Sequence, residues 1–421
     1  MSEPGSGPRG SRAHDIVLFG ATGFTGQLVA EYLARQRPEG LRWALGGRSR
    51  DKLERVRSGL AAIDGRLAEL PLVLADSNDE AALQRLAAST RVVCTTAGPF
   101  VLHGKKLLAA CAEAGTDYCD ITGEVPFIRW AIDTQQARAK ESGARIVSCC
   151  GFDSLPSDLG VLLLAENLQQ RGAQLAAATL AVERVHGELS GGTLASMMNL
   201  MEEASRDRGL RRLLASPYAL VPERESERDP KDAELRGVRW DEELRRWTAP
   251  FVMAAINTRV VRRSNALLGH PYGRSFRYSE VMAFPRGPKG LALAAGLTGG
   301  LGLFMLVASS DRLRPLVAKR LPAPGQGPSQ AEREAGLFRV RLIGQSAPDA
   351  SGRVLRAQAR VEANGDPGYS ETAKMLAESA LCLALDELPA PGGILTPSVC
   401  LGHKLIERLR RRDMVWSVES I

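Results

Sequence analysis

Three glycines close to the start of the chain, Gly20, Gly23 and Gly26, have a spacing that suits the binding of a phosphate group. They follow the apolar run 15–19 and precede a helical pattern, so a strand, a turn and a helix are expected in that order. The first turn of a helix offers unpaired N–H groups and a partial positive charge, and glycines let the backbone approach a pyrophosphate closely. We therefore predict a dinucleotide-binding loop made of Gly20, Ala21, Thr22, Gly23, Phe24, Thr25 and Gly26. The alternative is a tight turn that holds no ligand.

The type of dinucleotide is indicated by Arg48, which lies 22 residues beyond Gly26 and is followed by Ser49. NAD-specific domains place an Asp or Glu at about this distance to hold the ribose 2′-hydroxyl. A carboxylate would repel a 2′-phosphate, whereas a guanidinium binds it with two charge-assisted hydrogen bonds. Arg48 and Ser49 therefore favour NADP(H) over NAD(H). The alternative is a surface arginine that opens a helix.

Further cofactor contacts are expected where later strands end. Asp76 follows the apolar run 70–74 and is placed to meet an adenine. The loop with Ala97, Gly98 and Pro99 follows the run 91–96, and its backbone amides are expected near the ribose or the nicotinamide. Strand-ending turns without a ligand are the alternative at both places.

Polar residues after the last two strands of this unit are candidates for substrate or nicotinamide contact: Asp120, Thr122, Glu124, Asp153 and Ser154. Asp120 and Glu124 could form an acid–base pair. The second group equally suits a helix N-terminus together with Ser157 and Asp158. His103 is a weaker candidate for a general acid, and the sequence does not determine the catalytic proton donor. No two histidines have metal-ligand spacing, so no metal site is predicted.

The elements that must position these residues alternate between short apolar runs and helical patterns. Six strands are expected at 15–19, 43–46, 70–74, 91–96, 118–121 and 145–148. This alternation predicts an α/β fold: a Rossmann-like, doubly wound parallel sheet over 14–150, after a flexible tail over 1–13.

From residue 151 to 421 the rhythm changes, and we predict a second, mixed α+β domain for substrate binding or dimerisation. It should contain helices over 155–168 and 196–214, strands over 176–185 and 338–343, a charged surface loop over 223–236 and a Pro/Gly-rich linker over 321–329.

The segment 290–310 stands apart because its 21 residues carry no charge. Basic residues flank it on both sides, namely Arg286, Lys289, Arg312, Arg314, Lys319 and Arg320. Its length permits a bilayer span, but its glycines and alanines keep the hydrophobicity modest. A buried Gly/Ala-rich helix, a membrane-seated hairpin or monotopic helix, and a true span all stay open.

Composition limits the class of protein. The 421 residues contain 55 Lys and Arg against 48 Asp and Glu, a formal charge of +7, which suits an anionic cofactor or an acidic membrane surface. The basic residues form no stripe with interleaved aromatics, so no nucleic-acid binding is predicted. The seven cysteines show no paired CxxC motifs, and no secretory signal is visible, so we expect free thiols in a reducing compartment.

Taken in order, the segments 20–26, 47–49, 97–100, 118–124, 151–158 and 392–397 resemble the saccharopine dehydrogenase family, in particular its saccharopine dehydrogenase-like oxidoreductases, which are similar to bacterial trans-acting enoyl reductases. The resemblance runs from about residue 14 to the end. It implies a Rossmann domain followed by a mixed domain, and association with lipid droplets, other membranes or mitochondria. The bacterial relatives imply reduction of a lipid double bond and glycolipid biosynthesis. It does not imply saccharopine as the substrate, because no cluster of basic residues that would bind it can be placed here.

We therefore expect an NADP(H)-dependent oxidoreductase that acts on a lipid or lipid-linked substrate at the cytosolic face of a membrane or lipid droplet, with a mitochondrial pool and without secretion. The alternative is a catalytically silent nucleotide-binding scaffold on lipid droplets, since no proton donor is evident. The sequence does not determine the oligomeric state, although a homodimer through the second domain would be ordinary.

Overall fold

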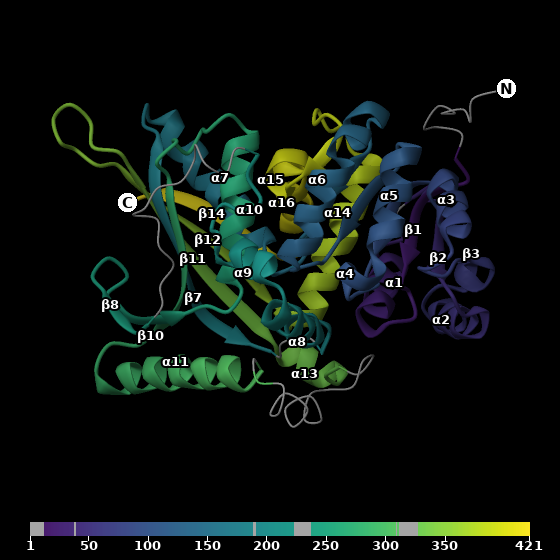
Figure 1. Cartoon of the computed structure of the whole chain (residues 1–421), viewed down its shortest axis with the longest axis horizontal. Helices are drawn as coiled ribbons and strands as arrows, with labels where there is room; N and C mark the ends of the chain where they lie inside the picture. Colours follow the sequence, from purple (N-terminus) through teal and green to yellow (C-terminus); the bar gives the residue numbers. More distant parts are fainter. Residues whose placement is uncertain (1–11, 38, 188–190, 223–236, 309, 311–326) are drawn as a thin grey trace. The chain divides into compact units, whose positions relative to one another are not determined.

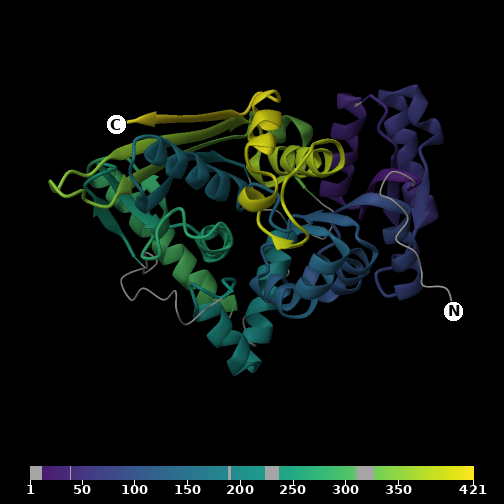
Figure 2. The same ribbon diagram turned by 90° about the horizontal axis from the view of Figure 1, so that it is seen from above.

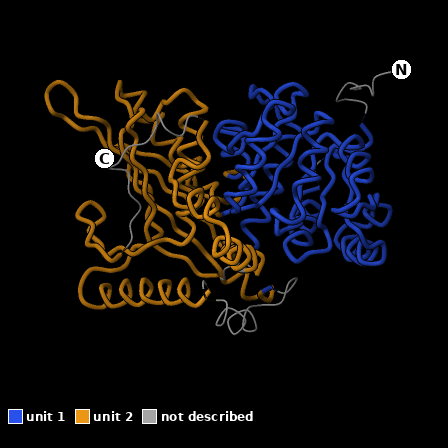
Figure 3. The backbone as a smooth tube through the Cα atoms, in the orientation of Figure 1, with its two compact units in different colours: residues 1–152, 325–327, 369–409 blue, residues 153–324, 328–368, 410–421 orange. Residues whose placement is uncertain are grey.

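The computed structural model describes residues 12–37, 39–187, 191–222, 237–308, 310 and 327–421, and these form two compact units (Figure 3). The first unit contains residues up to 152, together with 325–327 and 369–409. The second contains 153–324, 328–368 and 410–421. The expected tail, charged loop and linker lie wholly or largely outside the described residues.

A parallel sheet of seven strands forms the centre of the first unit, in the order β13-β6-β5-β4-β1-β2-β3. The strands are β1 (His14–Phe19), β2 (Trp43–Gly47), β3 (Leu72–Leu74), β4 (Thr90–Thr95), β5 (Asp117–Asp120), β6 (Arg145–Val147) and β13 (Gly393–Leu395). The innermost strands are almost entirely apolar and buried, which is typical of a parallel sheet covered on both faces. The Rossmann-like prediction is confirmed, with all six expected strands present.

Helices cover both faces of this sheet, as Figure 1 shows. On one face α1 packs against α2 and α14, and on the other α5 packs against α3 and α6. The helices of the unit are α1 (Phe24–Gln36), α2 (Arg50–Ile63), α3 (Glu80–Ser89), α4 (Phe100–His103), α5 (Lys105–Ala114), α6 (Val125–Ser142), α14 (Thr372–Leu385), α15 (Pro397–Cys400) and most of α16 (Gly402–Arg410).

The structure differs from the predicted domain boundary at the C-terminal end. The prediction assigned all of 151–421 to the second domain, whereas 369–409 returns to the first unit. Strand β13 pairs in parallel with β6, and buried helix α14 contacts β1, β4 and β5. The physical reason is that the edge of the sheet at β6 and the apolar face over the central strands both need cover, and a late segment supplies it.

The second unit is built on a mixed sheet of seven strands in the order β14-β12-β11-β7-β10-β9-β8. Only β7 and β10 pair in parallel. The strands are β7 (Leu175–His186), β8 (Arg239–Asp241), β9 (Arg246–Pro250), β10 (Arg277–Phe284), β11 (Leu337–Ser346), β12 (Arg356–Asn364) and β14 (Val415–Ser420). The mixed α+β character is confirmed.

Two helices pack on this second sheet: α7 (Leu155–Gln170) contacts β11 and β12, and α10 (Ala254–Leu267) contacts β10 and α7. Side chains alternate over the second half of β12, where Ala359, Val361 and Ala363 are buried, Arg360 is exposed and Glu362 is half-buried. This period of two is typical of a sheet with one face against helices and the other more open. The remaining helices of the unit are α8 (Gly191–Arg206), α9 (Arg208–Ala215), α11 (Pro288–Ala308) and α13 (Gln330–Ala335).

The apolar segment forms one continuous helix, α11, drawn in green in Figures 1 and 2. Only Gly290, Ala294 and Ala308 are buried, on the side that packs beside β9 and β10. The larger apolar side chains are exposed, among them Leu303 at 64% and Leu306 at 66%. Of the described helices, α11 alone has the length and apolar composition to cross a membrane. The structure thus excludes both a buried core helix and a hairpin for this segment.

Candidate cofactor-binding site

The predicted cofactor residues gather at one edge of the first sheet. Strands β4, β1, β2 and β3 are consecutive neighbours and run in parallel, so the loops that follow them lie at the same edge. These loops carry all of the predicted residues, from Gly20 to Gly26, Arg48, Ser49, Asp76 and 97–99. The loops after β1 and β4 are in direct contact although they lie 76 residues apart in the chain: the Thr96 hydroxyl donates to the Gly20 carbonyl over 3.2 Å.

The glycine loop, residues 20–26, requires glycine at two positions. Gly20 has a φ of +85°, in the region that favours glycine, and its N–H donates to the Gly46 carbonyl over 3.0 Å. A Cβ at Gly26 would lie 2.2 Å from the Gly20 oxygen. The turn is therefore closed tightly onto itself, and helix α1 begins directly from it.

The N-terminus of α1 is open to an anion. The helix has no side-chain cap and no acidic residue in its first turn. Gly23, its N-cap, is exposed, and a Cβ there would meet only the Gly20 oxygen, at 3.4 Å. Unpaired N–H groups at a helix start bind phosphate. The geometry fits a dinucleotide pyrophosphate. In contrast, the Phe24 side chain packs edge-to-face against Tyr369, with the two ring centroids 4.9 Å apart.

Arg48 is exposed at the end of β2 and makes no hydrogen bond or ion pair with any described residue. Ser49 is the N-cap of α2 but its hydroxyl makes no capping bond. Arg50 is occupied by Glu54 at 3.7 Å, and Asp51 is the acid in the first turn. A free guanidinium beside a free hydroxyl at a helix N-terminus fits a 2′-phosphate.

In the loops that follow β3 and β4, groups that were expected to contact the cofactor make hydrogen bonds within their own loop. The Asp76 carboxylate accepts the Asn78 N–H over 2.8 Å, and Asp79 caps α3. In the loop after β4, the amides of Ala97 and Gly98 already donate to Thr95 and Thr96. The amides that were expected to reach a ribose or nicotinamide are thus in use, and Pro99 has none. The carbonyls of Ala97 and Gly98 are left to accept.

Asp120 and Glu124 do not form an acid–base pair, which corrects the prediction. Glu124 is buried and its carboxylate accepts the N–H groups of Phe100 at 2.9 Å and Val101 at 2.7 Å. It therefore caps α4 and holds the loop that follows β4. The sequence offered no signal for this contact, because a cap normally lies within the same turn of chain.

Asp120 is fully buried and structural. Its carboxylate accepts the Tyr118 hydroxyl at 2.8 Å and the Thr122 N–H at 3.0 Å, along with the Ser148 hydroxyl and the Cys149 N–H. Burial raises the pKa of Asp120 to about 6, although these donors oppose the shift. Thr122 is buried too, and its hydroxyl accepts the Glu124 N–H. The loop 120–124 is thus an internal scaffold.

The raised pKa of Asp120 predicts a pH effect on stability that Asp120→Asn removes. Below the unfolded-state pKa of about 4 the carboxyl is protonated in both states. As the pH rises to about 6, the unfolded chain ionises first, so the wild type loses about 3 kcal/mol of stability from this group. The variant should therefore gain about that much relative to the wild type between pH 4 and pH 7. Urea unfolding at both pH values measures this, and a constant difference between the two proteins would contradict it.

The remaining polar candidates lie in the second unit and are mostly engaged. The Ser154 hydroxyl donates to Asn257 over 2.9 Å, and the Asp158 carboxylate accepts the Ser264 hydroxyl. Both therefore bind helix α7 to helix α10. Asp153 makes no hydrogen bond or ion pair within the described residues, and burial raises its pKa to about 6. Asp153 is the candidate acid that stays available for chemistry.

Two further sequence predictions concern His103 and the cysteines. His103 is exposed at the end of α4. All seven cysteines are free and buried. Within the described residues no three His, Cys, Asp or Glu side chains are grouped so that they could hold a metal ion.

Comparison with known proteins agrees with this site. The model of the saccharopine dehydrogenase NADP binding domain matches residues 16–147. A trans-acting enoyl reductase of Mycobacterium ulcerans is 41% identical over 424 residues, covering 97% of this chain and 99% of its own length. A Mycobacterium tuberculosis relative, also placed by name among these reductases, is 45% identical over 412 residues, 94% of this chain and 96% of its own.

The fold has a counterpart among solved structures. Apo saccharopine dehydrogenase (L-Glu forming) from Saccharomyces cerevisiae aligns with a TM-score of 0.52 and 13% identity, covering 97% of this chain and 100% of that one. At this identity the likeness concerns the fold alone.

Proposed function

This chain belongs to the family of the trans-acting enoyl reductases and is an NADP-binding oxidoreductase, and from that premise we propose that it reduces a carbon–carbon double bond of a lipid or lipid-linked substrate. The observation that carries the proposal is the site at the edge of the first sheet. There the start of α1 has no side-chain cap and Arg48 has no partner among the described residues, so both are available to the phosphate groups of NADPH. The chain is also similar to named enoyl reductases over nearly its full length.

Each part of the site has a role in holding the cofactor. The N–H groups at the start of α1 bind the pyrophosphate. Arg48 and Ser49 would bind the 2′-phosphate, and Asp76 would contact the adenine. The carbonyls of Ala97 and Gly98 would be able to accept from the nicotinamide carboxamide. Glu124 holds their loop in place through the amides of Phe100 and Val101.

The reaction needs a hydride and a proton. When bound, NADPH supplies the hydride, which adds to one carbon of the double bond and leaves NADP⁺. The other carbon takes a proton, so the double bond becomes a single bond and the electrons balance. Asp153 is the residue we propose as the proton source. It has no hydrogen-bond or ion-pair partner among the described residues, and burial raises its pKa to about 6, so a protonated fraction remains near neutral pH.

We further propose that the enzyme works at the cytosolic surface of a lipid droplet or membrane. Helix α11 supports this, since one stripe of small residues packs on the protein while Leu303, Leu306 and other apolar side chains are exposed. Contiguous exposed apolar surface of this kind marks an interaction site. A monotopic placement of α11 in the interface would hold the enzyme at the surface that contains its lipid substrate.

The reductase proposal is tested by following NADPH oxidation with enoyl and keto lipids presented on vesicles. We expect oxidation with an enoyl lipid, unchanged NADPH binding in Asp153→Asn, and a lower turnover number in that variant. Binding of NADPH without oxidation of any substrate would favour the nucleotide-binding scaffold instead.

Docking through α11 predicts a separate effect. The double variant Leu303→Ser, Leu306→Ser should lose binding to phosphatidylcholine vesicles by at least ~10-fold, because two large apolar side chains no longer leave water. Vesicle flotation measures this. Leu385→Ser is the matched control, since Leu385 is an exposed leucine at the end of α14 in the other unit. Equal flotation of all three proteins would contradict docking through this helix.

A further inference from the structure

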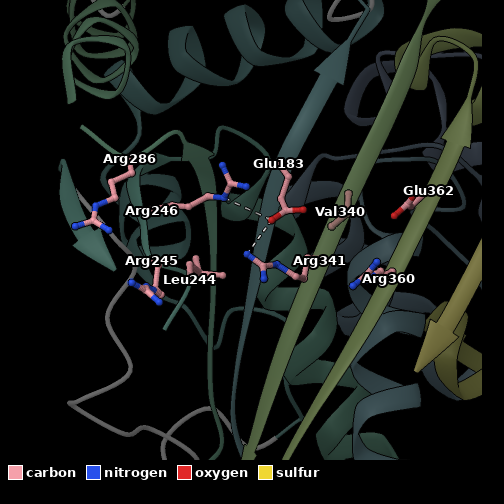
Figure 4. Close-up of a pocket in the computed structure, with 9 residues that line it drawn as sticks. All are labelled: Glu183, Leu244, Arg245, Arg246, Arg286, Val340, Arg341, Arg360 and Glu362. Carbon is pink, nitrogen blue, oxygen red and sulfur yellow. Dashed lines mark ion pairs between the residues drawn. The ribbon is translucent and has the colours of Figure 1, made fainter. Parts of the chain in front are cut away.

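A cavity of about 530 Å³ lies on the open face of the second sheet, outside the cofactor site (Figure 4). We call it the arginine pocket. Strands β7, β9, β11 and β12 contribute to it, as do the β8–β9 turn and the turn before α11. Its lining residues are Glu183, Leu244, Arg245, Arg246, Arg286, Val340, Arg341, Arg360 and Glu362.

The pocket carries more positive than negative charge, with five arginines against two glutamates. Glu183 is shared by Arg341 at 2.8 Å and Arg246 at 3.7 Å, the two ion pairs drawn in Figure 4. Glu362 is occupied by Arg339, which stands outside the pocket, at 2.9 Å. Neither carboxylate is thus available to neutralise the remaining arginines.

Several donors in the pocket are left without a partner. Arg245 and Arg286 make no ion pair or hydrogen bond with any described residue. The Nε of Arg341 is buried and has no hydrogen-bond partner. A buried donor without a hydrogen-bond partner lowers the stability of the fold. A ligand that supplies an acceptor in the pocket would remove this cost. Phosphate oxygens are the best-suited acceptors, because guanidinium groups bind them through pairs of parallel hydrogen bonds.

The backbone conformation at Arg245 also supports phosphate binding in the pocket. Arg245 has a φ of +52°, a conformation that non-glycine residues rarely adopt. A glycine would fit this position of the hairpin without strain. The chain instead places an arginine there, beside Leu244, which belongs to a buried apolar cluster with Ala181, Val281, Ala283 and Ile343. The hairpin is thereby fastened to the sheet with Arg245 at the rim of the pocket.

The pocket adjoins the apolar helix along the chain. Arg286 lies two residues before α11, which begins at Pro288, and Lys289 is exposed in the first turn of that helix. An apolar helix alone distinguishes poorly between neutral and acidic lipid surfaces. Basic groups at its start add attraction to anionic lipids, worth about 1 kcal/mol for each Lys or Arg near the surface.

We propose that the arginine pocket binds the phosphate headgroup of an anionic phospholipid when α11 lies in the membrane interface. The inference rests on the docking part of the proposed function and adds selectivity for an acidic surface to it. Arg245, Arg286 and Arg341 bind the headgroup, and α11 contacts the acyl chains. The nucleotide site takes no part.

The test compares vesicles of phosphatidylcholine with and without phosphatidic acid, by flotation of the full chain. Wild type should prefer vesicles that contain phosphatidic acid. The double variant Arg245→Gln, Arg286→Gln should bind them ~30-fold more weakly, which is the loss of two surface arginines. It should bind pure phosphatidylcholine as the wild type does. Arg274→Gln, which removes an exposed arginine of the same unit outside the pocket, should change neither. Stabilisation by NADPH in a thermal melt confirms that each variant is folded.

The outcomes separate the inference from its premise. Equal binding of wild type to both vesicle types, or equal binding of wild type and double variant to phosphatidic acid, overturns the headgroup site and leaves docking intact. Flotation with neither vesicle type overturns docking through α11, and the headgroup site with it. Stabilisation by inorganic phosphate that requires Arg245 and Arg286, without any preference among vesicles, assigns the pocket to a soluble phosphate and overturns the lipid assignment. NADPH oxidation measured in detergent tests the reductase activity independently of these vesicle-binding and phosphate-binding results.

Discussion

Replacing Gly26 by alanine is expected to weaken NADPH binding by ~100-fold or more. The new Cβ would lie 2.2 Å from the Gly20 oxygen and 2.9 Å from the Thr96 hydroxyl oxygen. The first of these neighbours is backbone, so the loop itself has to move and the N–H groups at the start of α1 no longer converge on the pyrophosphate. Each charge-assisted hydrogen bond that is lost costs about 1.5–3 kcal/mol, and the loss of two accounts for the expected factor. Titration followed by nicotinamide fluorescence measures it.

Gly59→Ala is the matched control for this substitution. Gly59 lies exposed within α2, and a Cβ there would meet nothing within 4 Å. Alanine in an exposed helix interior is favoured over glycine by about 1 kcal/mol, so this variant should melt slightly higher and bind NADPH normally. Normal NADPH affinity in folded Gly26→Ala would mean that the loop does not bind the pyrophosphate.

Replacing Arg48 by aspartate is expected to weaken NADPH binding by ~100-fold while leaving NADH binding within a few-fold of the wild type. The guanidinium is exposed and has no partner among the residues that the structure describes, so its removal breaks no contact with them. The introduced carboxylate repels the 2′-phosphate. The lost charge-assisted hydrogen bonds are worth about 3 kcal/mol together. NADH has a 2′-hydroxyl, which a carboxylate can accept from. Parallel titrations with both nucleotides give the ratio.

The control is Arg55→Asp, which makes the same charge change one turn into α2 on an exposed side chain. It separates a local effect at the phosphate from a general effect of net charge, because long-range attraction is screened at physiological salt. Equal losses for NADPH and NADH in Arg48→Asp would show that Arg48 does not read the 2′-phosphate.

Much of the first unit could be predicted because its signals are local. Each buried strand is a short apolar run, each turn is punctuated by glycine or proline, and Gly20, Gly23 and Gly26 stand directly between strand and helix. A parallel topology follows from strict alternation. For the same reason the segments that end at Arg48, Asp76 and Pro99 could be assigned to one edge of the sheet from the sequence.

The errors concern contacts between distant segments. Asp120 and Glu124 follow a strand and were expected to be accessible, yet both are buried. The Asp120 carboxylate accepts from Ser148 and Cys149 of another strand end. The Glu124 carboxylate accepts the amides of Phe100 and Val101. Which of several carboxylates turns inward depends on the space left by packing, and spacing along the chain does not contain that information.

What the sequence determined by itself is thus the strand–turn–helix order of the first unit, the glycine loop and the cofactor that Arg48 favours, since each rests on neighbours within one or two turns of chain. The tertiary structure alone decided that 369–409 completes the first unit and that α11 exposes its leucines. It also decided that five arginines from four separate segments line one pocket with Glu183. These arrangements arise from strand pairing and packing over long sequence separations. The free energy that stabilises these arrangements is shared among many weak contacts between distant segments, so a local sequence pattern does not predict them.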